Sequence, residues 1–322
     1  GPIHAAEGKV VSMKGIAILL PLGLVVALGA LLRRRGLLPR EVVPCLTGLL
    51  YWVALPALLL RTAASAGAEA LGHPAFFLGV NLPFLAVPLL AWGIARWAHR
   101  GNRPRQAFSA FASIRANNVY LGLPAVTLAM GEPGVRALSA YLAAGLVGYN
   151  VASLAWAELV RTGRLDLPTL GRALGRLARN PLILSTLGGL ACAAAGLERF
   201  PAPLDLPLKI LGDTASGLAL LSLGASLEFR ALGRAVRSTL PDSLVKLLLH
   251  PALAWLCLLP FGLPRELVSA SVLVSAMPHA VNCFIVAQEM DLDAPYAADA
   301  VLGSTLLSAL SFPLWLGLLG LS

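Results

Sequence analysis

The chain is a succession of long apolar runs joined by short polar connections in which arginine is the commonest charged residue. Ten of these runs reach the length of about 20 residues at which an α-helix crosses a bilayer. They cover roughly residues 15–32, 42–63, 75–98, 107–130, 135–160, 181–197, 207–228, 240–262, 267–290 and 296–320. The pattern predicts an all-α polytopic membrane protein with one transmembrane helix for each run.

A low content of charged residues distinguishes the chain from soluble proteins. Hydrophobic residues make up 57% of its 322 positions and charged residues 13%, and its mean hydropathy is +0.78. A soluble domain carries about 25% charged residues. The net charge of +9 does not indicate nucleic-acid binding, because the basic residues lie in short connections where membrane topology accounts for them. The four cysteines lie in or beside apolar runs without CxxC spacing, which argues against a disulfide framework or a metal site.

The basic residues alternate between the two sides of the predicted membrane. The connections after the first, third, fifth and seventh runs hold 16 of the 25 Lys and Arg residues. By the positive-inside rule these connections are cytoplasmic, which places both termini on the outer side of the cell membrane. The first run ends at Arg33 without a small-residue cleavage site, so we expect it to be retained as a span. Residues 1–12 precede Met13 and open on Gly-Pro, and we interpret them as the remainder of a cleaved tag.

The run at 107–130 contains residues that a smooth transmembrane helix does not favour. Arg115, Asn117 and Asn118 place a cation and two amides in it. Gly122 and Pro124 follow, and a proline lacks the backbone N–H and clashes with the carbonyl four residues earlier. Interrupted backbone is tolerated in a membrane only where it is buried in protein or lines a cavity. This stretch is therefore a candidate binding site.

The second half of the chain carries a matching irregularity. Its fourth run contains Pro278, His279 and Asn282, so each half has a proline and an asparagine in its fourth run. Five spans per half is an odd number, so the halves would enter the membrane from opposite sides as an inverted repeat, which is common in secondary transporters. Interrupted helices turn N–H groups and a positive dipole end toward the gap, which suits an anion.

The predicted division of the chain follows from this repeat. The first five-helix unit covers residues 13–160, a cytoplasmic linker covers 161–180, and the second unit covers 181–322. The linker is rich in arginine and divides the chain nearly in half.

The side chains at the two irregular stretches suggest how an anion is held. The amides of Asn117, Asn118 and Asn282 donate and accept hydrogen bonds, so they can hold a carboxylate. Alternatively, they only satisfy backbone groups that the prolines leave free. Arg115 is expected to attract the anion or to brace the break, and a purely structural ion pair is the other interpretation.

Four further residues are candidates for coupling an ion to transport. Lys246 is the second basic residue inside a span, where it either faces a partner or reaches the interface. His279 titrates near neutral pH and either carries a proton or packs as a structural histidine. Gln288 and Glu289 either bind a cation or mark the membrane interface. The coupling ion is thus open between H⁺ and Na⁺.

Motifs of catalysis are absent from the sequence. It contains no GxSxG, no HExxH, no phosphate-binding loop with Lys and Ser or Thr, and no histidine pair suited to haem. We therefore expect neither an enzyme nor a cofactor.

The spacing Arg115-x-Asn117-x-x-Tyr120-x-Gly122-x-Pro124 resembles the fourth-span signature of the auxin efflux carrier family. That family holds plant auxin-efflux carriers and bacterial permeases for malate or malonate. The resemblance extends over essentially the whole chain, and the central loop is short, as in prokaryotic members. Its further matches are Ser222 to Gly224, Lys246 with Pro251, Pro278 with Asn282 and Ala287, and Ser304 to Pro313.

The resemblance implies a ten-helix fold of two inverted five-helix repeats, similar to that of sodium-coupled bile-acid transporters. Spans one, two, six and seven would form a scaffold, and the other spans a mobile transport domain for elevator-like alternating access. Asn117 and Asn282 would flank the substrate carboxylate where the broken spans cross, and Pro124 and Pro278 would shape the crossing. His279 departs from the plant pattern.

The function implied is secondary transport of small organic anions, carboxylates and auxin-like acids included. Two alternatives stay open: a sodium-coupled carrier of larger amphipathic acids, and a membrane sensor that binds the same anion without moving it. Whether two copies of the chain form a dimer is also open.

Overall fold

The structure of the chain is a computed structural model. It describes residues 20–21, 23–39, 41–71, 74–163, 168, 171, 179–226, 232–281 and 283–321. Residues 1–12, most of the predicted linker and Asn282 lie outside the described residues, as do the side chains of Gln288 and Glu289. Regular structure among the described residues is helical, apart from one isolated bridge between Ala116 and His279. The chain is an all-helical polytopic membrane protein.

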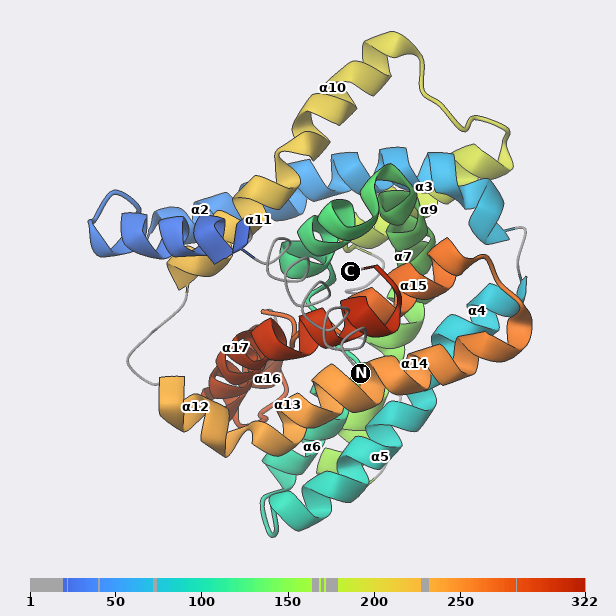
Figure 1. The fold of residues 1–322 in the computed structure, drawn as a ribbon. Helices are drawn as coiled ribbons and strands as arrows, with labels where there is room; N and C mark the ends of the chain where they lie inside the picture. Colours follow the sequence, from blue (N-terminus) through green and yellow to red (C-terminus); the bar gives the residue numbers. More distant parts are fainter. Residues whose placement is uncertain are drawn as a thin grey trace, which may run out of the picture.

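The first half begins with a helix at 23–34 and ends with α7 (Figure 1). Its labelled elements are α2 (Val42–Leu49), η1 (Leu50–Ala54), α3 (Leu55–Leu71), α4 (Pro74–Asn81), α5 (Pro83–Ala98), α6 (Arg103–Ala112), η2 (Asn118–Gly122) and α7 (Leu123–Thr162). Gly131 interrupts α7 with a φ of 64° and a ψ of −151°, so α7 consists of two helices. This interruption separates the runs that predict the fourth and fifth spans.

The second half is also built mostly of short helices. Its elements are α9 (Pro181–Ala194), α10 (Ala202–Asp213), α11 (Ala215–Ser226), α12 (Leu232–Ser238), α13 (Leu240–Leu244), η4 (Val245–Leu249), α14 (His250–Leu258), η5 (Leu259–Phe261), α15 (Arg265–Ser275), α16 (Cys283–Glu289) and α17 (Ala294–Leu318). α13, η4, α14 and η5 follow one another without a gap. α15 and α16 are separated by residues 276–282.

Several helix starts follow directly from capping residues. The side chains of Asn102, Asn180 and Asp293 each accept a first-turn backbone N–H, at 2.9 to 3.1 Å, at the start of α6, α9 and α17. Each cap is followed by a proline in the first two helical positions. A proline costs no hydrogen bond there, because the first N–H groups of a helix have no intrahelical partner.

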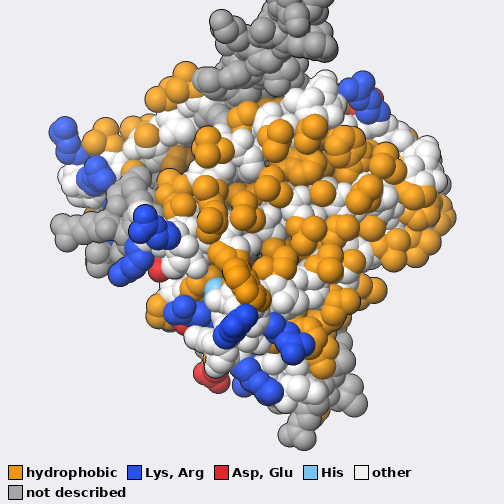
Figure 2. Space-filling view, turned by 60° about the horizontal axis from the view of Figure 1, so that its bottom comes forward, with side chains coloured by type: hydrophobic (Ala, Val, Ile, Leu, Met, Phe, Trp, Pro, Cys, Tyr) orange, Lys and Arg blue, Asp and Glu red, His pale blue; other side chains and the backbone are white. Residues whose placement is uncertain are grey.

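The described helices provide apolar segments of membrane-spanning length. Four continuous segments qualify: Val42–Ser65, Pro74–Ala98, Leu240–Phe261 and Ala294–Leu318. A further pair, Tyr120–Gly145 and Gly148–Thr162, is bent by 47°. Figure 2 shows a broad apolar face with Lys and Arg side chains gathered toward its lower and left margins. Many large apolar side chains are exposed, Trp52 and Trp97 among them, as expected of a surface in contact with lipid.

The described helices form two groups (Figure 1). In the first group α3 packs against α9 and α10, and α11 packs against α2. In the second group α6 packs against α5, α14 against α15 and α4, and α17 against α12 and α16. α7 packs with the second group and also contacts α3, while η2 contacts α11. The irregular part of the first half therefore lies between the two groups.

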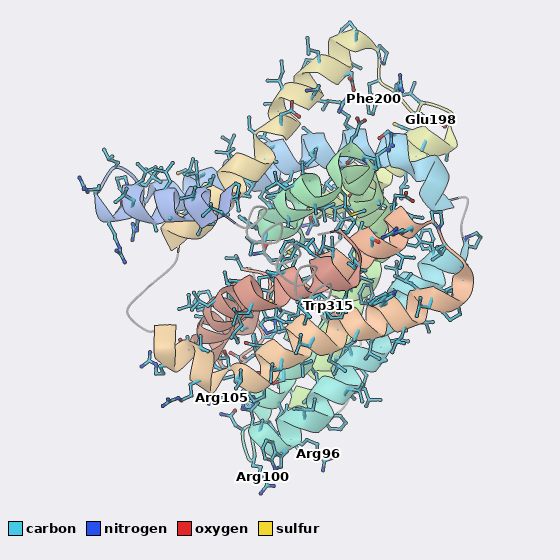
Figure 3. All side chains as sticks on the ribbon, in the orientation of Figure 1. Arg96, Arg100, Arg105, Glu198, Phe200 and Trp315 are labelled. Carbon is cyan, nitrogen blue, oxygen red and sulfur yellow. The ribbon has the colours of Figure 1, made fainter. Side chains whose placement is uncertain are left out.

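Charged loops mark the two ends of the molecule. Arg96, Arg100 and Arg105 lie at one end, and Glu198 and Phe200 lie at the opposite end (Figure 3). These are the loops after the third and the sixth predicted span, which the charge pattern assigns to opposite sides of the membrane.

Candidate functional site

The two interrupted segments meet through their backbones. The Asn117 N–H donates to the Pro278 carbonyl at 2.8 Å, and the Ala280 N–H donates to the Arg115 carbonyl at 2.9 Å. This reciprocal pair is the isolated antiparallel bridge of Ala116 with His279. It satisfies backbone groups that the missing helical turns would leave unpaired in an apolar surrounding. We call residues 113–122 together with 276–281 the crossover.

The break of the first half begins earlier than its sequence predicts. Gly122 and Pro124 are the expected breakers, yet residues 113–117 are the non-helical stretch and α7 has already resumed at Pro124. Between them η2 forms a widened turn, in which the Gly122 N–H donates to the Asn117 carbonyl at 2.9 Å. A Cβ on Gly122 would lie 3.3 Å from that carbonyl oxygen and 3.4 Å from Met277 Cγ. Glycine thus lets the two breaks approach closely.

The two asparagines at the crossover are buried and only partly hydrogen-bonded. Asn117 Oδ1 accepts the Tyr120 N–H at 3.1 Å and so caps η2. Asn117 Nδ2 and Asn118 Oδ1 have no hydrogen-bond partner within the described structure. A buried polar group without a partner costs about 1 to 3 kcal/mol. These two atoms therefore keep hydrogen-bonding capacity that the described structure does not use. The Tyr120 side chain, by contrast, lies beside Thr47 of α2.

Arg115 is buried among neutral partners. Its Nη1 donates to Asn150 Oδ1 at 3.0 Å and to Ser153 Oγ at 3.1 Å, both on α7. The guanidinium lies over the rings of Phe111, at 4.9 Å, and Tyr149, at 5.5 Å. Its Nε has no partner within the described structure. The side chain therefore braces the break against α7 and still keeps one buried donor unused.

Lys246 lies on η4 and is fully buried. Its Nζ donates to the carbonyl of Ser275, the last residue of α15, at 2.6 Å. It also lies 3.0 Å from His250 Nδ1. Since an ammonium only donates, His250 Nδ1 accepts, and the proton of a neutral ring sits on Nε2. That Nε2 has no partner among the described residues.

His279 is fixed from three sides. Its backbone N–H donates to Ser304 Oγ at 3.1 Å, and its Nδ1 lies 3.2 Å from the Ala112 carbonyl, to which a protonated Nδ1 donates. The ring meets Phe108 edge-on at 6.1 Å. Its Nε2 has no partner within the described part of the chain.

The two buried cations in and beside the crossover, Arg115 and Lys246, are not matched by acidic contacts among the described residues. Among the described residues no carboxylate lies within 4.0 Å of Arg115 or Lys246, although ion pairs occur elsewhere in the chain. No group of three or more His, Cys, Asp or Glu side chains that could hold a metal occurs in the searched residues. Two buried cations without carboxylate partners make this region suited to an anion.

A second polar cluster joins the ends of α5, α13 and α17. Asp242 Oδ2 accepts from the Tyr296 hydroxyl at 2.6 Å and lies 3.3 Å from His99 Nε2. Beside it, Arg105 Nε donates to Asp293 at 2.7 Å, and its guanidinium covers the Tyr296 ring at 4.7 Å. Burial alone would raise the pKa of Asp293, but the hydrogen bonds from Arg105 and from the Tyr296 N–H outweigh it and lower the pKa.

The structure brings together most of the residues singled out in the sequence. Arg115, Asn117, Asn118, Pro278 and His279 converge on the crossover, and Lys246 contacts its α15 side. Sequence reasoning missed the partners of the cations and of His279, which are Asn150, Ser153, His250 and Ser304. Asn150 was detectable as a polar residue within an apolar run, and His250 by its spacing of four residues from Lys246. The contacts of Ser153 and Ser304 required the fold.

Comparisons with known proteins agree on transport. A family model described as membrane transport protein matches residues 168–316. The chain is 29% identical over 296 residues, 90% of this chain and 91% of the relative, to a "Putative malonate transporter" of Rhizobium meliloti (strain 1021). It is 25% identical to an "Uncharacterized transporter" of Methanothermobacter thermautotrophicus over 90% of this chain and 93% of that protein. It is also 27% identical to "Auxin efflux carrier component 6" of Arabidopsis thaliana over 49% of this chain and 28% of that protein.

Proposed function

We propose that the chain is a secondary transporter of small organic anions that belongs to the auxin efflux carrier family and is not an enzyme, because it matches a family model described as membrane transport protein and is similar to proteins named as a malonate transporter and an auxin efflux carrier. The substrate would bind at the crossover through a carboxylate. The observation that carries this proposal is the pair of unused buried donors there, Asn117 Nδ2 and Arg115 Nε. A carboxylate has lone pairs for both donors and a charge that offsets the guanidinium.

Small carboxylates are the substrate class that the charge of the crossover supports best. Arg115 comes from the first half of the chain and Lys246 from the second, and both are buried. The relative that matches this chain over 91% of its own length is named as a malonate transporter. The plant relatives, which match over only part of their length, are named as auxin efflux carriers. Malonate and indole acids are therefore the first compounds to test.

We further propose that the chain is built from ten helices in two inverted repeats and works by an elevator-like motion. Close packing of glycines supports the scaffold of such an arrangement. A Cβ on Gly224 of α11 would meet the Val26 backbone, and a Cβ on Gly189 of α9 would meet the Leu60 backbone. These contacts join spans one and seven, and spans two and six. An inverted repeat that exchanges span one with six and span two with seven maps either contact onto the other.

The orientation proposed from the basic loops puts both termini on the non-cytoplasmic side. Protease or cysteine-labelling experiments on intact cells test it independently of substrate. The location proposed for the chain is the cell membrane, either an inner or a plasma membrane.

The proposed function is tested in two steps. First, a thermal-shift screen of monocarboxylates, dicarboxylates and indole acids, with and without sodium and at two pH values, identifies a ligand, since a ligand that binds only the folded protein raises its melting temperature. Second, flux of that ligand is measured in proteoliposomes. Saturable flux supports a carrier. Binding without flux would identify a sensor, and no response to any organic anion would refute the proposal.

A further inference from the structure

Asp242 is a buried carboxylate without a permanent cation beside it. It lies in the first turn of α13, in an apolar segment of membrane-spanning length, and its side chain is 5% exposed. Among the described residues no Lys or Arg lies within 4.0 Å of it, and the one cationic partner recorded there is His99. An unpaired charge is costly to bury, so the charge of His99 decides how well this carboxylate is balanced.

Three side chains share the hydrogen bonds of this cluster. The Tyr296 hydroxyl donates to Asp242 Oδ2 at 2.6 Å. His99 Nε2 lies 3.1 Å from the Tyr296 oxygen and 3.3 Å from the same Oδ2, so a proton on Nε2 is directed at both acceptors. With a neutral imidazole the cluster carries the negative charge of Asp242, and a second proton on His99 turns it into an ion pair. Histidine makes this change between about pH 5 and 8.

The cluster lies close to an aqueous end of the molecule. His99 is the C-terminal cap of α5, and its side chain is 6% exposed. Arg100 and Gly101 follow it in an exposed turn, at the end where Arg96 and Arg105 also lie (Figure 3). The charge pattern assigns this end to the cytoplasm. A proton from water therefore has a short way to His99.

Ring contacts join the cluster to the crossover. The Tyr296 ring meets His99 edge-on at 5.1 Å and Phe108 of α6 edge-on at 5.7 Å. Phe108 in turn meets His279 edge-on at 6.1 Å. Because these side chains are buried and closely packed, a shift of Tyr296 displaces Phe108 and with it His279.

A branch of the same series ends at Arg115. The rings of Phe108 and Phe111 are 6.3 Å apart on α6, and the Arg115 guanidinium lies over Phe111 at 4.9 Å. The cluster is therefore connected through packed rings to both a backbone partner and a cation of the candidate anion site.

Other charged groups near the cluster have partners of their own or lie in solvent. Arg105 of α6 pairs with Asp293 of α17, and the charge of His99 also acts on Asp293. On η4 and α14, Lys246 and His250 bond to each other. Among the described residues, further charged side chains on elements that pack against α5 or α17 are exposed, partly exposed or paired: Arg96, Arg100, Arg103, Glu158, Arg161, Arg234, Arg237 and Asp299.

We propose that His99, Asp242 and Tyr296 form a proton-binding site that is linked to the crossover, so that an anion binds more tightly when His99 carries its second proton. The added positive charge favours the anion, and the ion pair holds α5, α13 and α17 together. By thermodynamic linkage the anion then favours proton binding by the same factor. The link to the anion rests on the proposed function, whereas proton binding is testable without substrate.

The first experiment measures melting temperatures without substrate between about pH 8 and pH 6, where histidine titrates. His99→Gln keeps a neutral donor but cannot take up a proton. The wild type is expected to gain melting temperature relative to His99→Gln as the pH falls, because the ion pair exists only where the imidazole is protonated and is lost as the pH rises. Gln106→Ala is the matched control, since Gln106 donates to the His99 carbonyl at 2.9 Å and its loss leaves the ring in place. It is expected to follow the wild type.

The second experiment measures malonate affinity of the same proteins at both pH values. The ratio of wild-type to His99→Gln affinity is expected to rise at least about fivefold from pH 8 to pH 6. The titration of malonate itself cancels from this ratio. Phe108→Leu interrupts the ring contacts, so it is expected to keep the pH response of melting and to lose most of the pH response of affinity.

Parallel melting curves of wild type and His99→Gln would overturn the proton site, and a constant affinity ratio would overturn its link to the anion. If His99→Gln does not fold, the wild type decides through titration calorimetry in buffers of different ionisation enthalpy: proton uptake on malonate binding supports the link, and its absence overturns it.

The two proposals can fail separately. A wild type that binds no carboxylate refutes the proposed function, while a pH-dependent difference in melting from His99→Gln still supports the proton site. Conversely, malonate flux with parallel melting curves supports the proposed function and overturns the inference about His99.

Discussion

The backbone N–H of Asn117 donates to the carbonyl of Pro278 across 2.8 Å, and this bond ties the break of the first half of the chain to the break of the second. The residues are 161 positions apart in sequence, so the bond fixes the relative position of two helices that local structure alone cannot relate. It also sets the Asn117 side chain at the junction, with Oδ1 used for capping η2 and Nδ2 left unbonded.

Because the oxygen of the Asn117 amide caps η2 while its nitrogen is unbonded, two substitutions of Asn117 are expected to have different effects. Asn117→Asp keeps an oxygen that can accept the Tyr120 N–H but replaces the unbonded donor by a second acceptor. It is expected to abolish carboxylate binding with a loss of stability below about 1 kcal/mol, because aspartate caps as well as asparagine. Asn117→Ala is expected to lose binding and, in addition, about 1 kcal/mol of stability. Thermal melting and ligand titration of the two proteins measure both effects.

The matched control for this pair is Asn180→Asp, since Asn180 caps α9 through its Oδ1 in the same way. It is expected to leave binding unchanged. Normal affinity or uptake in Asn117→Asp would show that the amide only satisfies backbone, and would remove Asn117 from the substrate site.

Substitutions at and beside Arg115 are expected to separate carboxylate affinity from protein stability. Arg115→Gln removes the charge and the unused Nε donor, so carboxylate affinity is expected to fall about tenfold or more. Ser153→Ala removes one acceptor of Nη1 but keeps the cation, so it is expected to cost about 1 kcal/mol of stability and to leave affinity unchanged. Isothermal titration and melting curves of both proteins give the comparison. An Arg115→Gln protein with normal affinity would show that Arg115 is a brace and nothing more.

The sequence predicted the helical class and the two breaks because their signals are local. A proline, a glycine and unpaired polar residues inside an apolar run are visible without any knowledge of the fold. The position of the first break was less predictable: the chain leaves the helix at residues 113–117, ahead of Gly122 and Pro124. The widened turn of η2 absorbs the irregularity there, and whether it forms depends on packing against Met277 and on the bond to Pro278.

Partners of the buried cations were not predictable from sequence. Lys246 lies near the start of its apolar segment, where snorkelling to the interface is as reasonable as burial. Only the fold brings the Ser275 carbonyl, 29 positions away, into its reach. The contacts of Arg115 with Asn150 and Ser153 likewise depend on how α7 packs beside α6.

A substitution at Gly131, which lies outside the crossover, is expected to change the stability of the protein. Its φ of 64° and ψ of −151° lie in a region that only glycine adopts readily. Gly131→Ala is expected to destabilise the protein by about 1 to 3 kcal/mol without changing carboxylate affinity in the protein that folds. Gly163 is the control, because its φ of 80° and ψ of 5° are left-handed helical values that asparagine tolerates. Gly163→Asn is therefore expected to be nearly neutral, and equal melting temperatures for the two variants would contradict this account.

The ion pair of Arg105 with Asp293 predicts an acid-sensitive contact between α6 and α17. Since the pKa of Asp293 is lowered in the folded chain, the pair contributes stability above the ordinary carboxyl pKa of about 3.9 and loses it as the pH falls through the lower folded value. Asp293→Asn keeps the cap of α17 but lacks the charge. It is expected to be less stable than the wild type by less than about 1 kcal/mol at neutral pH, because Arg105 is partly exposed.

The measurement compares melting temperatures of wild type and Asp293→Asn between neutral pH and about pH 3, where an ordinary aspartate is mostly protonated. The difference between them is expected to shrink on acidification, because the Asp293 carboxyl of the unfolded chain takes up a proton before that of the folded chain, and this favours unfolding of the wild type only. Asp213→Asn serves as control, since Asp213 pairs with Lys209 on an exposed face and is expected to matter little at any pH. Equal melting temperatures of the two proteins over the whole range would mean that Asp293 stabilises α17 through its cap alone, and that the bond to Arg105 contributes nothing to holding the two helices together.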